Sequence, residues 1–179
     1  MTRKLLHQGP AFTLYAEDAS MPDGRIVTLD VVRHPGAAAV VPFRSEDEVL
    51  LLRQFRHAAG GDIWEIPAGK LDGEAPEICA ARELEEEAGV RAGRLEPLGA
   101  VWTTPGFTDE RIHLFAAWDL TPCPQQLEHD EYLEVVPTPF DEALEMVFRG
   151  EISDGKSALA LVLAARRLGR LGGSPDEAA

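Results

Sequence analysis

The sequence is poor in cysteine and contains no long apolar run. Its 179 residues include two cysteines, Cys79 and Cys123, which are too few for a disulfide framework. Cys79 falls next to Ile78 in a predicted helix, and we expect it to be a small buried apolar residue; neither cysteine is expected to have a chemical role. No apolar stretch reaches the length of a signal-peptide core or a membrane-spanning helix. We therefore expect a soluble, cytoplasmic protein.

Basic residues are also scarce. The 17 Lys and Arg residues are outnumbered by 31 Asp and Glu residues, which gives a formal net charge of −14 and a pI of about 4.7. Such a surface repels the phosphates of nucleic acids and the headgroups of anionic membranes. We expect neither a nucleic acid nor a membrane as a partner, and we expect bound cations to offset part of the charge.

The rest of the composition fits one globular domain, because 45% of the residues are apolar and can form a core. Either Ser153 or Asp154 is placed to cap the last helix. The order of elements favours an α/β sandwich with a mixed sheet between helices, followed by a disordered tail over 172–179. Strands are predicted over 12–15, 25–32, 37–43, 49–55, 63–66, 95–103, 111–118 and 133–136, and helices over 76–88, 141–148 and 157–168.

The most informative segment is an acidic helix predicted between Pro76, in its first turn, and Gly89, which ends it. On a helix, Glu83, Glu86 and Glu87 lie on one face. Hard divalent cations prefer converging carboxylate oxygens, and Mg²⁺ usually takes further ligands from water and substrate phosphates. The cluster therefore suggests a phosphate-containing substrate. A solvated acidic helix face is the alternative, but it explains neither the Gly-rich turn before the helix nor the glycine that ends it.

This segment resembles the Nudix box, Gly-x5-Glu-x7-Arg-Glu-U-x-Glu-Glu-x-Gly-U with U aliphatic, which marks a family of pyrophosphohydrolases. The match is complete from Glu74, since seven residues separate it from Arg82-Glu83-Leu84-Glu85-Glu86-Glu87-Ala88-Gly89-Val90. One departure precedes it, because four residues rather than five lie between Gly69 and Glu74. Either the turn is one residue shorter or Ala68 takes the place of the glycine, and the sequence Pro67-Ala68-Gly69 favours the shorter turn.

The resemblance implies a Nudix-type α/β/α sandwich with a mixed sheet over residues 37–171. It implies that residues 1–36 form a small antiparallel sheet used in dimerisation, so a homodimer is expected. It also implies that Mg²⁺, or Mn²⁺ in its place, is bound by Glu83, Glu86 and Glu87, with the backbone carbonyl of Ala68 as a further ligand.

Two segments before the box are similar to ADP-ribose and nucleotide-sugar pyrophosphatases. They are the sequence Arg53-Gln54-Phe55-Arg56 and the sequence Glu65-Ile66-Pro67-Ala68-Gly69. In those enzymes the second arginine approaches the substrate, which implies a substrate-binding role for Arg56, although a surface ion pair is the alternative. Trp64 is a candidate for stacking on a base, and a half-buried core tryptophan is the competing interpretation.

The loop Thr104-Pro105-Gly106-Phe107-Thr108-Asp109-Glu110 is similar to the ADP-ribose subgroup, in which a proline follows the box at about the distance of Pro105, 16 residues after Gly89. Pro and Gly favour a tight loop, and Phe107 offers a flat apolar face to a ligand. Glu110 is predicted to serve the substrate ribose or a metal. For Pro105 taken alone, an ordinary turn is the alternative.

An acidic segment precedes the last predicted strand, where ADP-ribose pyrophosphatases carry a metal ligand and often a general base. The alignment makes Glu131 the acid on the metal side and places the base at His129, where the family usually has a glutamate. Histidine can accept a proton near neutral pH. Glu128, Asp130 or a glutamate of the box are alternatives for the base, although Glu128 alone is better interpreted as part of a solvated turn.

Together these residues predict Mg²⁺-dependent hydrolysis of ADP-ribose to AMP and ribose 5-phosphate, with Glu86, Glu87, Glu131 and His129 as catalytic residues. Other nucleoside diphosphate sugars are alternative substrates, since nothing in the sequence identifies the sugar. An alternative of another class is a non-catalytic sensor that binds ADP-ribose, and the intact set of acids argues against it. Removal of RNA caps is disfavoured by the net charge of −14.

Overall fold

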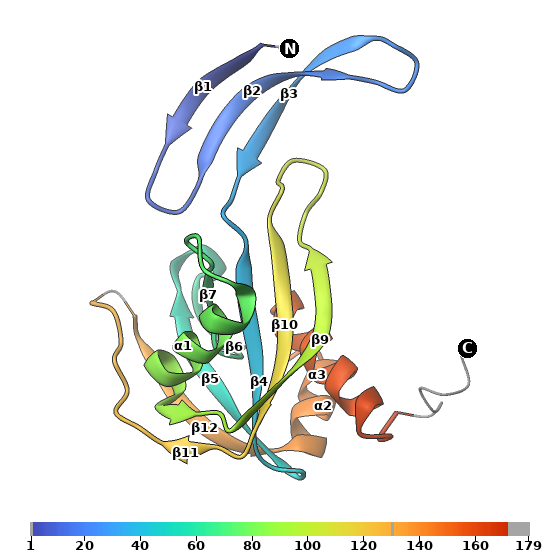
Figure 1. Cartoon of the computed structure of the whole chain (residues 1–179). Coiled ribbons are helices and arrows are strands. Elements are labelled where there is room, and N and C mark those ends of the chain that lie inside the picture. The colour runs from blue at the N-terminus through green and yellow to red at the C-terminus, as the bar shows by residue number, and fades with distance from the viewer. Residues whose placement is uncertain (1, 130, 172–179) are drawn as a thin grey trace.

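A computed structural model describes residues 2–129 and 131–171. Its helices lie on both faces of a mixed sheet, with α1 on one face and α2 and α3 on the other (Figure 1). This confirms the predicted α/β sandwich. The strands are β1 (Arg3–Gln8), β2 (Thr13–Ser20), β3 (Ile26–Arg33), β4 (Ala37–Ser45), β5 (Glu48–Arg56), β6 (Gly61–Glu65), β7 (Ala68–Lys70), β8 (Val90–Arg91), β9 (Arg94–Trp102), β10 (Arg111–Trp118), β11 (Thr121–Pro122) and β12 (Leu133–Pro139). The helices are α1 (Pro76–Ala88), α2 (Phe140–Phe148) and α3 (Gly155–Arg167), with a 3₁₀ turn at His57–Ala59.

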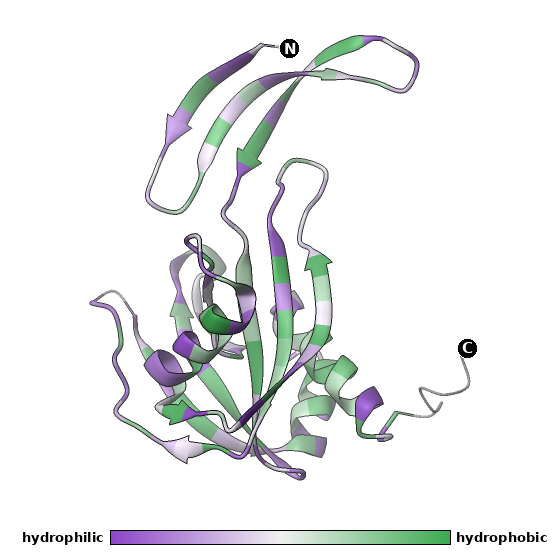
Figure 2. Ribbon diagram, in the orientation of Figure 1, coloured by the Kyte–Doolittle hydropathy of each residue, from purple (hydrophilic) through white to green (hydrophobic). Residues whose placement is uncertain are grey.

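The central strand β4 explains how the layers are held. Its run of small apolar residues is buried on both faces, as expected for a strand between two helical layers. Ala38 and Val40 pack against α1 around Leu84, whereas Val41 and Phe43 pack against α2 and α3. Burying a leucine such as Leu84 stabilises the folded state by about 1.5–3 kcal/mol. The green bands of β4 and β10 in Figure 2 mark this apolar centre.

The strand order β12-β5-β4-β10-β9 contains one parallel pair, β4 with β10. Strands β4 and β5 pair only near the hairpin that joins them, between Phe43 and Val49 and between Ser45 and Glu48. Beyond that point β6 pairs with β5, and β7 pairs with β4. The segment from β6 through Pro67 to β7 therefore fills the space between diverging strands, and it lies beside α1.

The three strands of the first sheet, β1 to β3, form an antiparallel sheet that extends away from the sandwich (Figure 1). The small N-terminal antiparallel sheet implied by the resemblance is confirmed, although β1 was not predicted as a strand and β2 continues to Ser20 instead of ending at Tyr15. These segments are rich in polar residues and contain no fully buried residue, so they lack a clear apolar pattern. Several large apolar side chains are nevertheless exposed on this sheet, namely Leu5, Leu6, Ile26, Val27 and Leu29.

Local sequence explains the helix ends. Helix α1 begins at Pro76 and stops at Gly89, which adopts φ 64°, a left-handed conformation that suits glycine. Asp154 caps α3 by accepting a hydrogen bond from the backbone N–H of Ser157 at 3.0 Å, which settles the choice between Ser153 and Asp154. Within the part of the chain that the structure describes, no helix is long and apolar enough to cross a membrane. The predicted disordered tail lies outside the described residues.

Candidate active site

The inner face of α1 places two carboxylates against the sheet. Glu83 and Glu87 are 7% and 2% exposed, a degree of burial that is rare for acidic side chains. The backbone N–H of Ala68, at the start of β7, donates to Oε2 of Glu87 at 2.8 Å. Burial is the main cause that raises the pKa of Glu87, to about 8, and the neighbouring carboxylates Glu83 and Glu131 raise it further.

Glu83 lies directly over Gly69 of β7. A Cβ atom on Gly69 would come within 1.7 Å of Oε1 of Glu83, so a side chain at position 69 would force the Glu83 carboxylate to move. This close approach supports Gly69, not Ala68, as the glycine of the box. Burial raises the pKa of Glu83, although Arg82 opposes the shift. Metal-free protein thus holds two carboxylates whose charged form is disfavoured.

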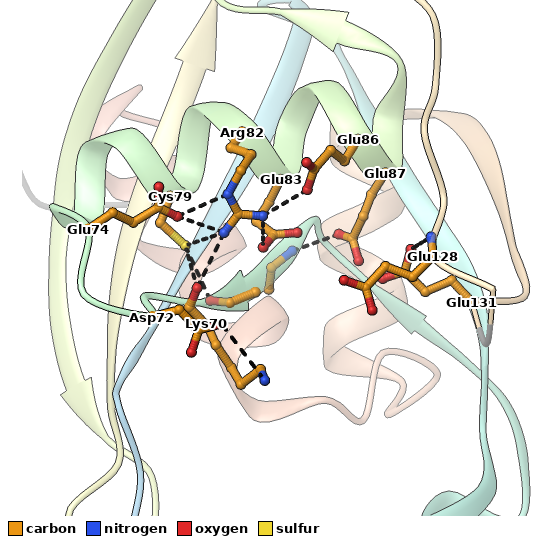
Figure 3. A network of polar contacts seen from close by, with 12 residues as sticks. Lys70, Asp72, Glu74, Cys79, Arg82, Glu83, Glu86, Glu87, Glu128 and Glu131 are labelled. Carbon is orange, nitrogen blue, oxygen red and sulfur yellow. Dashed lines mark hydrogen bonds and ion pairs between the residues drawn. The ribbon is translucent and has the colours of Figure 1, made fainter. Parts of the chain in front are cut away.

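Arg82 connects the carboxylates of this region (Figure 3). Its guanidinium donates to Glu74 at 2.7 and 3.0 Å, to Glu83 at 2.7 Å and to Glu86 at 2.7 Å. It also donates to the backbone oxygen of Lys70 at 3.3 Å. Burial lowers the pKa of Arg82, but these carboxylates outweigh burial and raise it overall. Arg82 and Glu74 therefore hold the turn before α1 in place despite its shorter length.

Cys79 reinforces the same junction from beneath the helix. Its buried thiol lies 3.4 Å from the backbone oxygen of Gly69 and 3.3 Å from that of Lys70. Burial raises the pKa of the Cys79 thiol to about 12, so the thiol stays protonated and can donate to these oxygens. The expectation of a buried residue is confirmed.

The acidic segment before β12 reaches the same region. Glu131 lines the cleft formed by Glu83, Glu86 and Arg82, and its Oε2 accepts a hydrogen bond from the backbone N–H of Glu128 at 2.7 Å. Glu128, interpreted from the sequence as part of a solvated turn, lines this cleft as well. His129 is exposed and is not among the cleft-lining residues, and Asp130 lies outside the described residues.

Two clefts meet at this site. The acidic cleft has a volume of about 500 Å³, and a larger cleft of about 740 Å³ lies next to it. Arg56, Ala68, Gly69 and Lys70 line both. Among the described residues, three basic and six acidic side chains line the acidic cleft, whereas three basic and three acidic side chains line the larger one. The negative charge is thus concentrated beside α1.

Arg56 stands where the clefts join. Its Nε atom lies 3.1 and 3.2 Å from the two carboxylate oxygens of Glu65, and its Nη2 atom lies 2.7 Å from Oε2. Burial opposes the charge on Arg56, but the contact with Glu65 raises its pKa overall. Because Glu65 is only 4% exposed, this pair fixes the direction of the arginine.

Of the other residues predicted from the sequence, some line a cleft and others do not. Glu110 lines the larger cleft and accepts a hydrogen bond from Oγ1 of Thr103 at 2.9 Å. Trp64 packs against the hydrophobic core and lines neither cleft. Pro105 and Phe107 are exposed in the loop between β9 and β10 and also line neither cleft.

Several cleft residues come from distant elements and were not predicted as site residues from the sequence. Trp102, at the end of β9, and Lys156, at the start of α3, line the larger cleft with Glu65. Lys70 lines both clefts. Glu65 belongs to a segment that the sequence singled out, whereas no local motif marked Lys70, Trp102 or Lys156, although Lys156 lies two residues after the capping residue Asp154.

The donor set of the acidic cleft consists of oxygen atoms, which suits a hard divalent cation. Among residues 2–129 and 131–171, no group of three His, Cys, Asp or Glu side chains is already arranged to hold a metal ion. The guanidinium of Arg82 explains this, because its Nη1 atom lies 2.7 Å from both Glu83 and Glu86. The residues fit a divalent cation by their chemistry, and a cation would have to compete with Arg82 for these oxygens.

Comparison with known proteins agrees with this site. The NUDIX domain family matches residues 32–159. Over 90% of its length the chain is 39% identical to an "ADP-ribose pyrophosphatase" of Bacillus subtilis, covering 89% of that protein. It is 37% identical to a "Methanol dehydrogenase activator" of Bacillus methanolicus, over 87% of this chain and 86% of that protein. It is 38% identical to a "GDP-mannose pyrophosphatase" of Cronobacter sakazakii, over 74% of this chain and 78% of that protein.

A solved structure described as "Crystal structure of ADP compounds hydrolase" superposes with a TM-score of 0.81 at 21% identity, over 96% of this chain and 95% of that one. At this identity the likeness concerns the fold. The chain belongs to the NUDIX family. It is a Nudix hydrolase that acts on a pyrophosphate bond.

Proposed function

We propose that this protein hydrolyses the pyrophosphate bond of ADP-ribose to give AMP and ribose 5-phosphate. The observation that carries the proposal is the junction at Arg56, where a strongly acidic cleft opens into a larger, electrically balanced one. A diphosphate with its cations suits the first, and a nucleoside or sugar suits the second. The names of two curated relatives, ADP-ribose pyrophosphatase and GDP-mannose pyrophosphatase, support a nucleoside diphosphate derivative.

Mg²⁺, with Mn²⁺ as a substitute, is the proposed cofactor. Glu83, Glu86, Glu87 and Glu131 are the proposed ligands, together with the backbone carbonyl of Ala68. When bound, the cation neutralises charge on the diphosphate and lowers the pKa of water. The raised pKa of Glu87 supports this role, since a buried carboxylate next to other carboxylates is stabilised in its charged form by a nearby cation.

The protein's own groups position the diphosphate and accept the proton. Arg56 is proposed to contact the diphosphate, because Glu65 holds it where the two clefts join. Glu131 and Glu128 both line the acidic cleft, so each can accept the proton of the attacking water through a carboxylate oxygen. His129, the base proposed from the sequence, lies on the same loop and remains a candidate.

A homodimer formed through the β1–β3 sheet is part of the proposal. A small sheet gains stability when its apolar side chains are covered, and this one exposes Leu5, Leu6, Ile26 and Leu29. Light scattering combined with size-exclusion chromatography measures the mass directly. A mass equal to the 19.5 kDa of one chain at micromolar concentration would contradict a stable dimer. The cytoplasmic location and the domain limits of 1–36, 37–171 and 172–179 also remain proposals.

A turnover panel tests the substrate. ADP-ribose, several nucleoside diphosphate sugars, a dinucleoside polyphosphate and a nucleoside triphosphate are compared by kcat/KM, each with Mg²⁺ and with Mn²⁺. We expect ADP-ribose to give the highest value and the products to be AMP and ribose 5-phosphate. If kcat/KM for a sugar nucleotide such as GDP-mannose were about ten times that for ADP-ribose, the proposed substrate would be wrong. The assignment of the protein as a hydrolase would still hold.

A further inference from the structure

A partly buried ionic network joins the start of α3 to the larger cleft. Arg56 and Lys156 both contact the carboxylate of Glu65, Arg56 at 2.7 Å and Lys156 through Nζ at 3.5 Å. Lys156 also contacts Oδ2 of Asp154 at 2.9 Å. One carboxylate therefore holds two cations on the same wall of the cleft.

This network is anchored at both ends. Asp154 caps α3 and accepts hydrogen bonds from both the backbone N–H and the hydroxyl group of Ser157. The Oγ atom of Ser157, itself fully buried, accepts a hydrogen bond from the backbone N–H of Ile66 at 2.9 Å. Ile66 precedes Pro67 and Ala68, so the start of α3 is tied to the strand segment that lines both clefts.

Lys156 differs from an ordinary surface lysine in this setting. Its side chain is 13% exposed, yet it lines the larger cleft. A lysine ammonium group has three N–H donors. The hydrogen bond to Asp154 and the ion pair with Glu65 engage at most two of these donors, which leaves one for a ligand in the cleft.

The other walls of the larger cleft suit a nucleoside or sugar. Val101, Trp102, Ile112 and Leu159 give it an apolar side, and its basic and acidic side chains balance. Lys156 lines this cleft but not the acidic one, whereas Arg56 lines both. Lys156 is thus placed beside a part of the substrate that lies outside the acidic cleft.

We propose that Lys156 is a substrate-contact residue whose ammonium group donates to an oxygen of the nucleotide held in the larger cleft. The inference rests on the proposed function, because it takes a nucleoside diphosphate derivative as the occupant. Asp154 and Glu65 act as positioning residues that hold the ammonium group in place. The acceptor is an oxygen of either a phosphate or a ribose hydroxyl.

Steady-state kinetics of Lys156→Met with ADP-ribose and saturating Mg²⁺ test the contact. We expect KM to rise about tenfold while kcat changes by less than about threefold, since a lost ground-state contact appears in KM. Lys156→Arg, which keeps the charge and the donors, should recover part of the loss. Arg166→Met is the matched control, because it removes one positive charge from an exposed position of the same helix.

Isothermal titration calorimetry in EDTA gives a readout that does not depend on turnover. AMP, adenosine and ADP-ribose are titrated into the wild type and the variants. Weaker binding of AMP but not adenosine assigns the contact to a phosphate oxygen, and weaker binding of both assigns it to the nucleoside. Weaker binding of ADP-ribose alone assigns the contact to the half of ADP-ribose that AMP lacks, which is the second phosphate and the terminal ribose.

Wild-type KM and Kd values in Lys156→Met, at an unchanged melting temperature, would overturn the inference. So would losses of the same size in Arg166→Met. A lower melting temperature of Lys156→Met with an unchanged KM would show that Lys156 has only a structural role, as a member of an ion pair. Failure of the proposed function looks different, because the wild type itself would then fail to cleave ADP-ribose.

Discussion

The carboxylate of Glu83 occupies the space that a side chain on Gly69 would need. The ideal Cβ position at residue 69 lies 1.7 Å from Oε1 and 2.1 Å from Cδ of Glu83. A Cβ atom essentially never makes contacts this short, so the observed position of the Glu83 carboxylate requires glycine at residue 69. The glycine of the box therefore determines where Glu83 lies.

Gly69→Ala should consequently disturb Glu83 more than the fold. The added methyl group forces the Glu83 side chain away from β7, and we expect a loss of about 10–100-fold in apparent Mg²⁺ affinity, as for residues that orient metal ligands. Activity measured against Mg²⁺ concentration checks this. Gly61→Ala is the control, because a Cβ atom there meets no atom within 4 Å. Equal Mg²⁺ dependence in the two variants would show that the position of Glu83 is unimportant.

Glu86→Gln tests the acids directly. The change keeps the size of the side chain and removes a proposed metal ligand, so kcat should fall by about 10²–10³-fold with the fold intact. Glu85→Gln is a matched control at the preceding position of the helix. Oε2 of Glu85 lies 2.8 Å from Nη2 of Arg91 in an ion pair at the surface. Near-wild-type turnover of Glu86→Gln at saturating Mg²⁺ would rule out an essential role for this carboxylate.

The buried carboxylates predict how stability depends on pH without metal. The folded protein keeps the proton of Glu87 up to its raised pKa of about 8, whereas an ordinary glutamic acid loses it near 4.5. Between these values the unfolded state binds fewer protons, so stability falls as pH rises. The raised pKa of Glu83 acts in the same direction. In EDTA, the melting temperature should therefore decrease from about pH 5.5 to about pH 8.5.

Glu87→Gln isolates this effect, because the variant has no carboxyl group to titrate there. Its melting temperature should decline less over the same pH range. Saturating Mg²⁺ should raise the wild-type melting temperature most at high pH, since the metal binds deprotonated carboxylates. If the melting temperatures of the wild type and Glu87→Gln in EDTA declined in parallel with rising pH, the pH dependence would not come from Glu87.

Local signals explain which features the sequence could predict. Helix α1 was predicted with its observed bounds because Pro76 and Gly89 mark its ends, and β4 because its apolar run is continuous. The shortest strands, such as β7, were missed because they depend on tertiary pairing more than on residue pattern. The larger cleft was beyond prediction, since it combines side chains such as Trp102 and Lys156 that meet only in the folded chain.

A last prediction concerns the attachment of the loop between β9 and β10. Asp109 accepts hydrogen bonds from the backbone N–H of His34 at 2.9 Å and from Nη1 of Arg33 at 2.9 Å. The backbone N–H of Val32 donates to the oxygen of Phe107 at 2.8 Å. The next residue, Glu110, lines the larger cleft. The loop singled out by the sequence is thus fixed to the end of β3.

Asp109→Asn should weaken this attachment while preserving the side-chain shape. Although burial opposes ionisation, the contacts with Arg33 and His34 lower the pKa of Asp109. The charged form of Asp109 therefore stabilises the fold at pH values above the usual pKa of aspartate. This contribution is lost as the pH falls through the lowered pKa of the folded state. At pH 7 we expect a loss of about 1 kcal/mol, because the pair is partly exposed, together with a several-fold higher KM for ADP-ribose and a nearly constant kcat. Asp62→Asn, which breaks the surface pair with Arg53, should reduce stability similarly and leave KM unchanged. If both variants keep the wild-type KM, the attachment stabilises the loop without shaping the cleft.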